Sequence, residues 1–178
     1  MPEIENNIPE KFWHILYTNP RSEKKMGALL KKYHIENYVP VRKERKKWSD
    51  RFKWSEFPVF PSYVFVKIEF WNEKTKVLQL PGAHHFIFDK GNPGVVSEEI
   101  LEDLRKGLES YNDTIQVVPD HVLEKGKMIR VIDGAYKGKT MEIIKRKNKA
   151  MVILRFEAMK IATSLEIPLE FLAWEELL

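Results

Sequence analysis

The sequence contains no cysteine, which excludes disulfide bonds, zinc–thiolate sites and thiol nucleophiles. It also lacks any apolar run close to the roughly 20 residues that a membrane-spanning helix needs. The start of the chain, Met1 to Asn6, is acidic and has no apolar segment of the kind that a secretory signal requires. These absences predict a cytoplasmic protein without a membrane partner.

The chain also has only a small excess of positive over negative charge. The 178 residues include 30 basic and 26 acidic side chains, for a formal net charge of +4 at pH 7. Because so mild an excess is common among soluble proteins, its distribution matters more than its size. Hydrophobic residues make up 43% of the chain and aromatic residues 12%, which is enough for packed cores in two small domains.

Residues with catalytic or metal-binding chemistry are present without the spacing that such sites need. The histidines are His14, His34, His84, His85 and His121. They show no metal-ligand spacing, and the neighbours His84 and His85 should point to opposite faces of a strand. The segment Gly134–Thr140 is similar to a phosphate-binding loop, but it is one residue short and no helix is expected after it. The sequence therefore predicts no enzyme activity, no metal and no cofactor.

The first half of the chain alternates short strands and helices. We expect Asn19-Pro20 to open the first helix, because Asn caps free backbone N–H groups and Pro suits the first helical position. Ser97 should cap a later helix in the same way. Strands are expected at 12–18, 36–41, 63–68 and 83–88, and a further helix at about 71–80. This order predicts an α+β fold with helices against an antiparallel sheet.

A strongly basic segment, Arg42 to Trp54, lies between two of these strands. It carries seven basic and two acidic side chains, and Ser49-Asp50 favours a turn in its middle. We therefore predict a protruding β-hairpin. A charge run is usually a solvated loop, but the aromatic residues Trp48, Phe52 and Trp54 favour a binding tip.

The second half is expected to be all-β. Short strands rich in Ile, Val and Met are predicted at 127–133, 140–146, 150–156 and 160–167, at a spacing typical of a small barrel. Gly134 suits a tight turn because glycine adopts positive φ readily. The acidic, amphipathic tail runs from Glu170 to Leu178. Since residues 109–122 show no clear period, we predict a first domain at 10–110, a linker at 111–122 and a second domain at 123–178.

Both halves resemble the NusG family of transcription factors. The matching pieces are Trp13–Tyr17, Glu23-Lys24-Lys25, Tyr38-Val39-Pro40, the basic segment, Phe60–Val66, Pro81-Gly82 and the KOW-like motif Gly126–Gly138. The resemblance implies an NGN domain, which is an α/β sandwich, followed by a small SH3-like KOW barrel. Ser62 replaces the family's usual Gly, and Asn19-Pro20-Arg21 replaces a Ser-Gly pair. These departures resemble specialised paralogues, of the RfaH and UpxY kind, that act on selected operons such as surface polysaccharide clusters.

The family resemblance implies a monomeric elongation factor that binds the clamp of the largest RNA polymerase subunits and promotes processive elongation or antitermination. Polymerase contacts map onto Tyr17, Phe60, Tyr63 and Phe65. We expect Tyr63 and Phe65 to face away from the helices of their own domain. Contacts to upstream or non-template DNA map onto Lys24, Lys25, Arg42, Lys43, Arg45, Lys46, Lys47, Arg51 and Lys53.

The KOW loop carries a further implied site. Ala135 and Tyr136 map to the loop through which relatives recruit the termination factor Rho or a small-subunit ribosomal protein, although Tyr136 fits local packing equally well. Two other functions stay open. A ribosome-associated or RNA-binding KOW protein would grip RNA with the basic segment, whereas a plain interaction module would have no nucleic-acid affinity even at low salt.

Overall fold

The computed structural model describes residues 9–173. The predicted acidic start and the end of the predicted tail therefore lie outside the described residues. The chain divides into two compact units: one takes the chain up to Val39 together with Ser62–Val95, and the other takes Pro40–Pro61 together with the chain from Val96 onward. Within residues 9–173, no helix is long and apolar enough to span a membrane.

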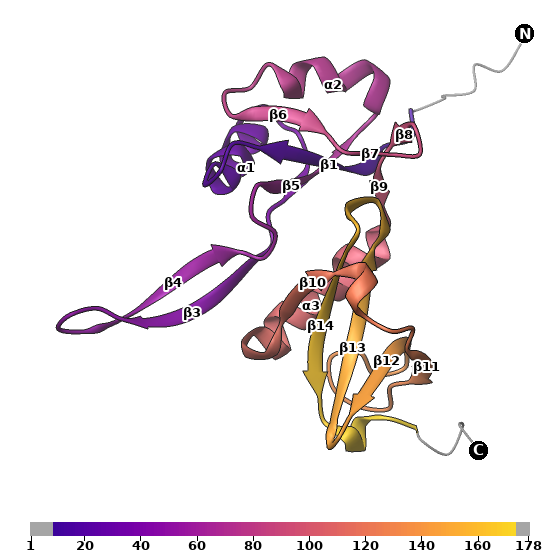
Figure 1. Cartoon of the computed structure of the whole chain (residues 1–178). Helices are drawn as coiled ribbons and strands as arrows, with labels where there is room; N and C mark the ends of the chain where they lie inside the picture. Colours follow the sequence, from indigo (N-terminus) through magenta and orange to yellow (C-terminus); the bar gives the residue numbers. More distant parts are fainter. Residues whose placement is uncertain (1–8, 174–178) are drawn as a thin grey trace, which may run out of the picture. The chain divides into compact units, whose positions relative to one another are not determined.

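The first unit is built on an antiparallel sheet in the order β2 (Asn37–Tyr38), β5 (Tyr63–Ile68), β1 (Phe12–Thr18) and β6 (Ala83–Phe86). The helices α1 (Glu23–Lys32) and α2 (Phe70–Leu78) cover one face of this sheet (Figure 1). The apolar core beneath them is formed by Leu16, Met26, Leu30, Val64, Val66, Ile68, Phe70, Val77 and Phe86. This arrangement confirms the predicted packing of helices on an antiparallel sheet.

The start of α1 differs from the prediction, and the cap at Ser97 agrees with it. Asn19 does not cap the helix, because α1 begins four residues later, at Glu23; the Asn19 carbonyl instead accepts the Ser22 N–H at 3.1 Å in a turn. The N-cap is Ser22, whose side chain makes no capping bond. The Asn-Pro pair therefore marks the turn before the helix. By contrast, the Ser97 hydroxyl accepts the Ile100 N–H at 3.2 Å and opens α3 (Glu98–Tyr111).

Three short strands follow β6, and the strand predicted at 83–88 is interrupted at Ile87. β7 (Phe88–Asp89) and β8 (Asn92–Pro93) pair as a small hairpin. β9 (Val95–Val96) is the point at which the chain passes from the first unit to the second.

The second unit contains a five-stranded antiparallel sheet. Its order is β10 (Gln116–Pro119), β14 (Ile161–Ile167), β13 (Lys149–Phe156), β12 (Thr140–Arg146) and β11 (Lys127–Arg130). Short 3-10 helices occur at Asn112–Thr114, Asp120–Val122, Glu157–Met159 and Leu169–Phe171. The sheet confirms the all-β prediction for this half and is consistent with a KOW domain.

The segment 111–122, predicted as a linker, is part of this second sheet. β10 pairs along β14, from Gln116 opposite Ser164 to Pro119 opposite Ile161. A four-residue edge strand is shorter than the 5–6 residues typical of strands and leaves no readable period. The preceding helix, α3, also belongs to the second unit rather than to the first.

Candidate functional site

The strands β3 (Val41–Lys47) and β4 (Phe52–Pro58) form the predicted basic hairpin (Figure 1). Their register is unbroken from Val41 opposite Pro58 to Lys47 opposite Phe52. Near the tip, the Trp48 N–H donates to the Arg51 carbonyl at 2.7 Å. The ribbon is a two-stranded sheet that pairs with no other strand of residues 9–173.

This hairpin holds the whole positive excess of the chain. Arg42 to Trp54 contains seven of the 30 basic and two of the 26 acidic side chains. The rest of the chain therefore has 23 basic and 24 acidic side chains, a net charge of −1. Such local concentration is the electrostatic signature of a nucleic-acid contact.

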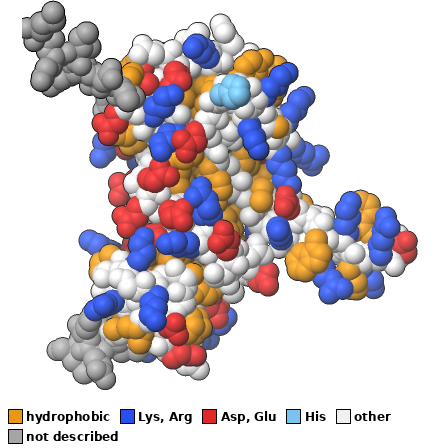
Figure 2. Space-filling view, turned by 180° about the vertical axis from the view of Figure 1, so that it is seen from behind, with side chains coloured by type: hydrophobic (Ala, Val, Ile, Leu, Met, Phe, Trp, Pro, Cys, Tyr) orange, Lys and Arg blue, Asp and Glu red, His pale blue; other side chains and the backbone are white. Residues whose placement is uncertain are grey.

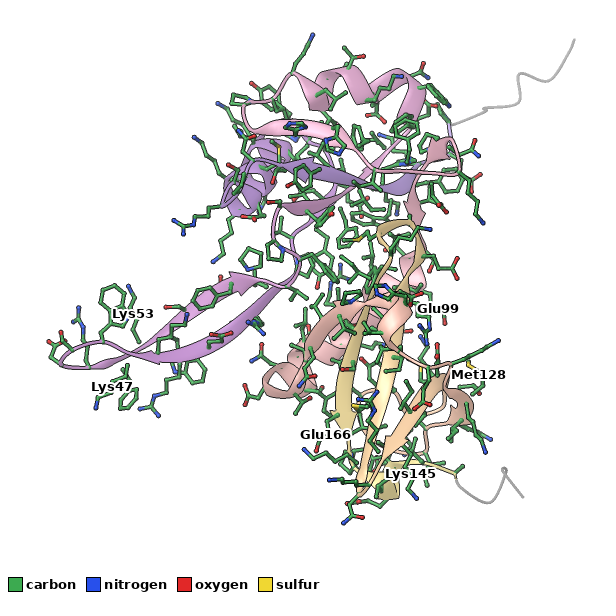
Figure 3. The ribbon with its side chains drawn as sticks, in the orientation of Figure 1. Lys47, Lys53, Glu99, Met128, Lys145 and Glu166 are labelled. Atoms are coloured by element: carbon green, nitrogen blue, oxygen red, sulfur yellow. The ribbon has the colours of Figure 1, made fainter. Side chains whose placement is uncertain are left out.

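Strand alternation divides the hairpin into two faces of different character. On what we call the paired face, Glu44 lies 2.8 Å from the Arg42 guanidinium and 3.8 Å from the Lys46 ammonium. On what we call the aromatic face, Arg45 lies opposite Trp54, and Lys47 lies opposite Phe52. Lys47 and Lys53 leave the ribbon on opposite sides (Figure 3).

Asn112 anchors the base of the hairpin within the second unit. Its amide Nδ2 donates to the Lys43 carbonyl, and its Oδ1 accepts the Lys43 N–H, each at 2.8 Å. The side chain thus pairs with β3 as another strand would. The sequence did not predict this role, because Asn112 falls in the predicted linker and no local pattern marks a long-range amide pair.

Two of the predicted nucleic-acid residues lie outside the hairpin. Lys24 and Lys25 are exposed on the first turns of α1, in the first unit, and Arg51 is exposed in the hairpin turn. The structure therefore brings seven of the nine predicted cations together on one ribbon: Arg42, Lys43, Arg45, Lys46, Lys47, Arg51 and Lys53.

A second candidate site lies on the sheet of the first unit. Tyr17 and Tyr63 are cross-strand partners, and their rings meet edge to face at 5.4 Å. Since the adjacent Val64 belongs to the core under the helices, Tyr63 points to the opposite face, as predicted. Burial, and then the neighbouring Tyr17, raises the pKa of Tyr63.

The histidine pair next to these tyrosines corrects a prediction. His84 and His85 do not point oppositely: their Nδ1 atoms lie 2.7 Å apart, and the His85 ring is 5.1 Å from that of Tyr17. The pairing of β1 with β6 shifts register between Tyr17 and Thr18, and such irregularities redirect side chains. Both histidines therefore extend the Tyr17–Tyr63 pair at the surface, where both are exposed.

The predicted four-residue polymerase patch does not form one exposed surface. Phe65 shares the side of β5 that carries Tyr63, but it is fully buried and stacks with Tyr38 of β2. Phe60 is also buried, and its ring packs edge to face on Phe156 at 4.9 Å within the second unit. Only Tyr17 and Tyr63 of the set keep accessible surface.

The turn before β5 is held by a buried carboxylate. Glu23 is 4% exposed, and its Oε1 accepts the Ser62 N–H at 2.6 Å. Ser62 has φ = 69°, a left-handed conformation that favours glycine. This explains why glycine suits the position, and it fixes the approach of the chain to Tyr63. Nothing in the sequence indicated that the Glu23 carboxylate would accept a hydrogen bond from the distant Ser62 N–H.

The KOW loop residue Tyr136 is occupied by local packing. Its side chain is fully buried, and its hydroxyl donates to the Asp103 carbonyl of α3 at 2.8 Å. The Lys139 ammonium pairs with the Asp103 carboxylate. Although burial opposes it, hydrogen bonding to Asp103 and Glu99 raises the pKa of Lys139. Ala135 keeps partial exposure.

Gly107 creates the socket for Tyr136. A Cβ at this position of α3 would lie 2.3 Å from the Tyr136 hydroxyl and 2.6 Å from Leu165. The segment that resembled a phosphate-binding loop leads into strand β12, with Gly134 and Gly138 at φ = 78° and 84°. Among residues 9–173, no three His, Asp or Glu side chains are grouped to hold a metal ion.

The α/β unit, the basic hairpin and the all-β sheet of the second unit have the architecture that the resemblance to the NusG family implies. The family model described as "Transcription termination factor nusG" matches residues 11–105, more than half of the chain. The chain belongs to the NusG family. This family consists of transcription factors that are not enzymes, as the sequence predicts.

The chain is also similar to individual NusG proteins. It is 29% identical over 105 residues to the transcription termination/antitermination protein NusG of Helicobacter pylori (strain ATCC 700392 / 26695), covering 57% of this chain and 53% of that protein. The match thus spans about half the length of that relative. Similarity to NusG of Streptococcus pyogenes serotype M3 (strain ATCC BAA-595 / MGAS315) is 24% over 155 residues, covering 82% and 86%.

Among solved structures, the chain is similar to the one titled "Domain interaction in Thermotoga maritima NusG". The two share 20% identity with a TM-score of 0.47, over 92% of this chain and 96% of the other.

Proposed function

We propose that this protein is a transcription elongation factor that binds RNA polymerase at the clamp of its largest subunits and promotes processive elongation and antitermination. Membership of the NusG family over residues 11–105 carries the proposal. The basic hairpin then contacts upstream or non-template DNA beside the bound polymerase. The factor acts as a monomer in the cytoplasm.

The polymerase contact is assigned to Tyr17 and Tyr63. The rings already pack on each other at 5.4 Å, so little side-chain freedom is lost on binding. Aromatic anchors of this kind dominate interface energies, with hot spots of about 2 kcal/mol or more. Phe65, buried two residues from Tyr63, supports the strand and is not itself assigned a contact.

Pull-down of the cognate core RNA polymerase tests this assignment. The wild type should bind, and a Tyr17→Ala, Tyr63→Ala double variant with an unchanged circular dichroism spectrum should lose at least tenfold in affinity. The matched control is Trp71→Ala, which removes a 64% exposed aromatic ring from α2 of the same unit. Absence of binding by the wild type overturns the proposed function. Equal binding by all three proteins overturns only the assignment of the interface.

Action on selected operons, such as surface polysaccharide clusters, is the finer proposal. It is supported by Ser62 in place of glycine and by the Asn19-Pro20-Arg21 turn, where Arg21 has φ = 63°. Transcript profiling after deletion of the gene provides the test. Loss of promoter-distal transcripts in a few long operons supports a specialised factor, and uniform loss across the genome contradicts it.

The KOW loop is proposed to recruit Rho or a small-subunit ribosomal protein. Because α3 occupies Tyr136, such a partner would meet Ala135 and the exposed Lys137 first. Titration of the labelled protein with each partner, followed by NMR, should shift the Ala135 amide. A complex that leaves residues 133–138 unshifted contradicts this site.

A further inference from the structure

The hairpin carries an arrangement that goes beyond a general attraction to phosphates. Phe52 and Trp54 stand two residues apart on β4, so both rings lie on the aromatic face. They are 57% and 63% exposed, which is unusual for side chains of this size. Adjacent same-side positions of a strand are about 7 Å apart, a distance at which separate bases of an extended strand can each find a ring.

Cations frame these two rings. Arg45 is the cross-strand partner of Trp54, and its guanidinium lies 4.3 Å above the Phe52 ring. Lys47 is the cross-strand partner of Phe52. These four side chains nearest the tip on this face include no acid; the acid of the face, Glu56, is opposite Lys43 toward the base. A polyanion with accessible base faces is the complement of such a surface.

The paired face of the same ribbon differs in two ways. Glu44 lies among its cations, and its exposed ring is Trp48 at the turn, 58% exposed with the Lys53 ammonium 5.9 Å from the ring. Glu44 neutralises part of its charge through Arg42 and Lys46, and the Lys46 ammonium lies 4.0 Å over the half-buried Phe57 ring. Figure 2 shows the mixture of basic and apolar side chains on the hairpin. The two faces therefore have similar numbers of cations. They differ in Glu44 and in the two neighbouring exposed rings, Phe52 and Trp54, which only the aromatic face carries.

The aromatic face is also hollowed toward its base. A cavity of about 430 Å³ is lined by residues that include Arg45, Trp54, Asn112 and Asp113. This volume falls in the range of about 300–1,000 Å³ typical of small-ligand sites. Asn112 and Lys43 both line this cavity, and the two bonds between them fix the position of β3 in its lining.

We propose that the aromatic face binds single-stranded DNA, with bases stacked on Phe52 and Trp54 and phosphates held by Arg45 and Lys47. The assignment to DNA rests on the proposed function, which places the hairpin at an opened DNA duplex. Duplex DNA hides its base faces, so it can use the cations and cannot use the rings. The hairpin thus selects the unpaired strand.

Fluorescence anisotropy with a labelled 12-nucleotide oligo(dT) and a 12-bp duplex tests the proposal on the full chain at low salt. The wild type should bind the single strand more tightly, although the duplex has the higher charge density. Phe52→Ala and Trp54→Ala should each weaken single-strand binding roughly 5- to 150-fold, corresponding to about 1–3 kcal/mol per stacked base. Trp54→Phe should restore most of the affinity.

Two controls separate stacking on this face from general attraction. Trp71→Ala removes a comparably exposed ring that also has a lysine over it, at 4.4 Å, and should leave DNA binding unchanged. Arg45→Gln with Lys47→Gln should weaken single-strand binding more than Arg42→Gln with Lys46→Gln, although both remove two charges. Equal loss from the two pairs, or tighter binding of the duplex by the wild type, overturns the proposal.

An oligo(U) of the same length tests the sugar. Tighter binding of oligo(U) than of oligo(dT) overturns the assignment to DNA. Failure here is distinguishable from failure of the proposed function, because the Phe52→Ala and Trp54→Ala proteins should still bind core RNA polymerase through Tyr17 and Tyr63.

Discussion

The hairpin and the β11–β12 loop both present an aromatic side chain among lysines, yet the structure uses the two differently. Trp54 is 63% exposed on a two-stranded ribbon. Tyr136 is fully buried because Gly107 of α3 leaves room for its ring and the Asp103 carbonyl accepts its hydroxyl. Tyr136 is therefore unavailable for binding because Gly107 leaves space for its ring, whereas Trp54 stays accessible.

The strongest test of this contrast compares two alanine variants. Tyr136→Ala should lower the free energy of unfolding by about 3–5 kcal/mol, because it empties a buried site and removes the hydroxyl bond to the Asp103 carbonyl. Trp54→Ala should change it by less than about 0.5 kcal/mol, since the ring is exposed. Urea denaturation followed by circular dichroism measures both. Similar losses for the two variants would contradict the division between them.

The socket itself can be tested at Gly107. Replacing a glycine within a helix by alanine ordinarily stabilises by up to about 1 kcal/mol. Here the added Cβ would meet the Tyr136 hydroxyl and Leu165, so Gly107→Ala should destabilise by about 1–3 kcal/mol. Ser110→Ala, an exposed change in the same helix, is the control. A gain in stability from Gly107→Ala would show that Tyr136 is not held by close packing.

The hairpin and the second sheet also differ in how far their ion pairs are buried. In the second sheet, Arg155 holds Glu142 with two bonds of 2.7 and 2.9 Å and also reaches Asp120 at 2.6 Å. On the hairpin, Glu44 pairs with Arg42 in a more exposed setting. Glu142→Gln should cost about 1–3 kcal/mol at pH 7, whereas Glu44→Gln should cost at most about 0.5 kcal/mol.

The Arg155–Glu142 ion pair also makes the stability of the second unit depend on pH. The hydrogen bonds from Arg155, helped by the Gly126 N–H, lower the pKa of Glu142 below its ordinary value of 4.5. Its contribution is therefore present above that value and is lost as pH falls through the lower, folded-state pKa. The stability difference between wild type and Glu142→Gln should shrink in acid. A difference that stays constant from pH 7 to pH 3 would refute the role of the pair.

A gain in stability is expected at the turn before Tyr63. Ser62→Gly relieves a positive φ and should raise the free energy of unfolding by roughly 0.5–1 kcal/mol. Ser62→Ala keeps the unfavourable conformation and should give no gain. If both variants behave alike in thermal denaturation, backbone strain at Ser62 does not limit stability.

Local patterns predicted the parts of this fold that depend on local chemistry. The Ser49-Asp50 turn within the basic segment predicted the hairpin, and Ser97 predicted the start of α3. Contacts between distant residues could not be foreseen in this way. The Asn112 bonds to Lys43 and the Glu23 bond to Ser62 join positions with no shared periodicity.

The same limit explains the errors in the candidate site. Alternation correctly placed Tyr63 opposite the helices, but it could not tell that Phe65 stacks on Tyr38 or that Phe60 packs on Phe156. A register shift at Tyr17 brought His84 and His85 together, and such shifts leave no mark in a single sequence. Exposure of an aromatic residue is thus decided by the tertiary partners that it meets.

The central claim, that this chain acts on elongating RNA polymerase, is tested most directly by transcription in vitro. A template with an intrinsic terminator, cognate polymerase and purified protein allow readthrough and pause lifetimes to be measured together. We predict that the wild type increases readthrough and shortens pauses, and that the Tyr17→Ala, Tyr63→Ala variant changes neither quantity. Unchanged transcription at saturating wild-type protein would contradict the central claim and would favour a ribosome-associated KOW protein.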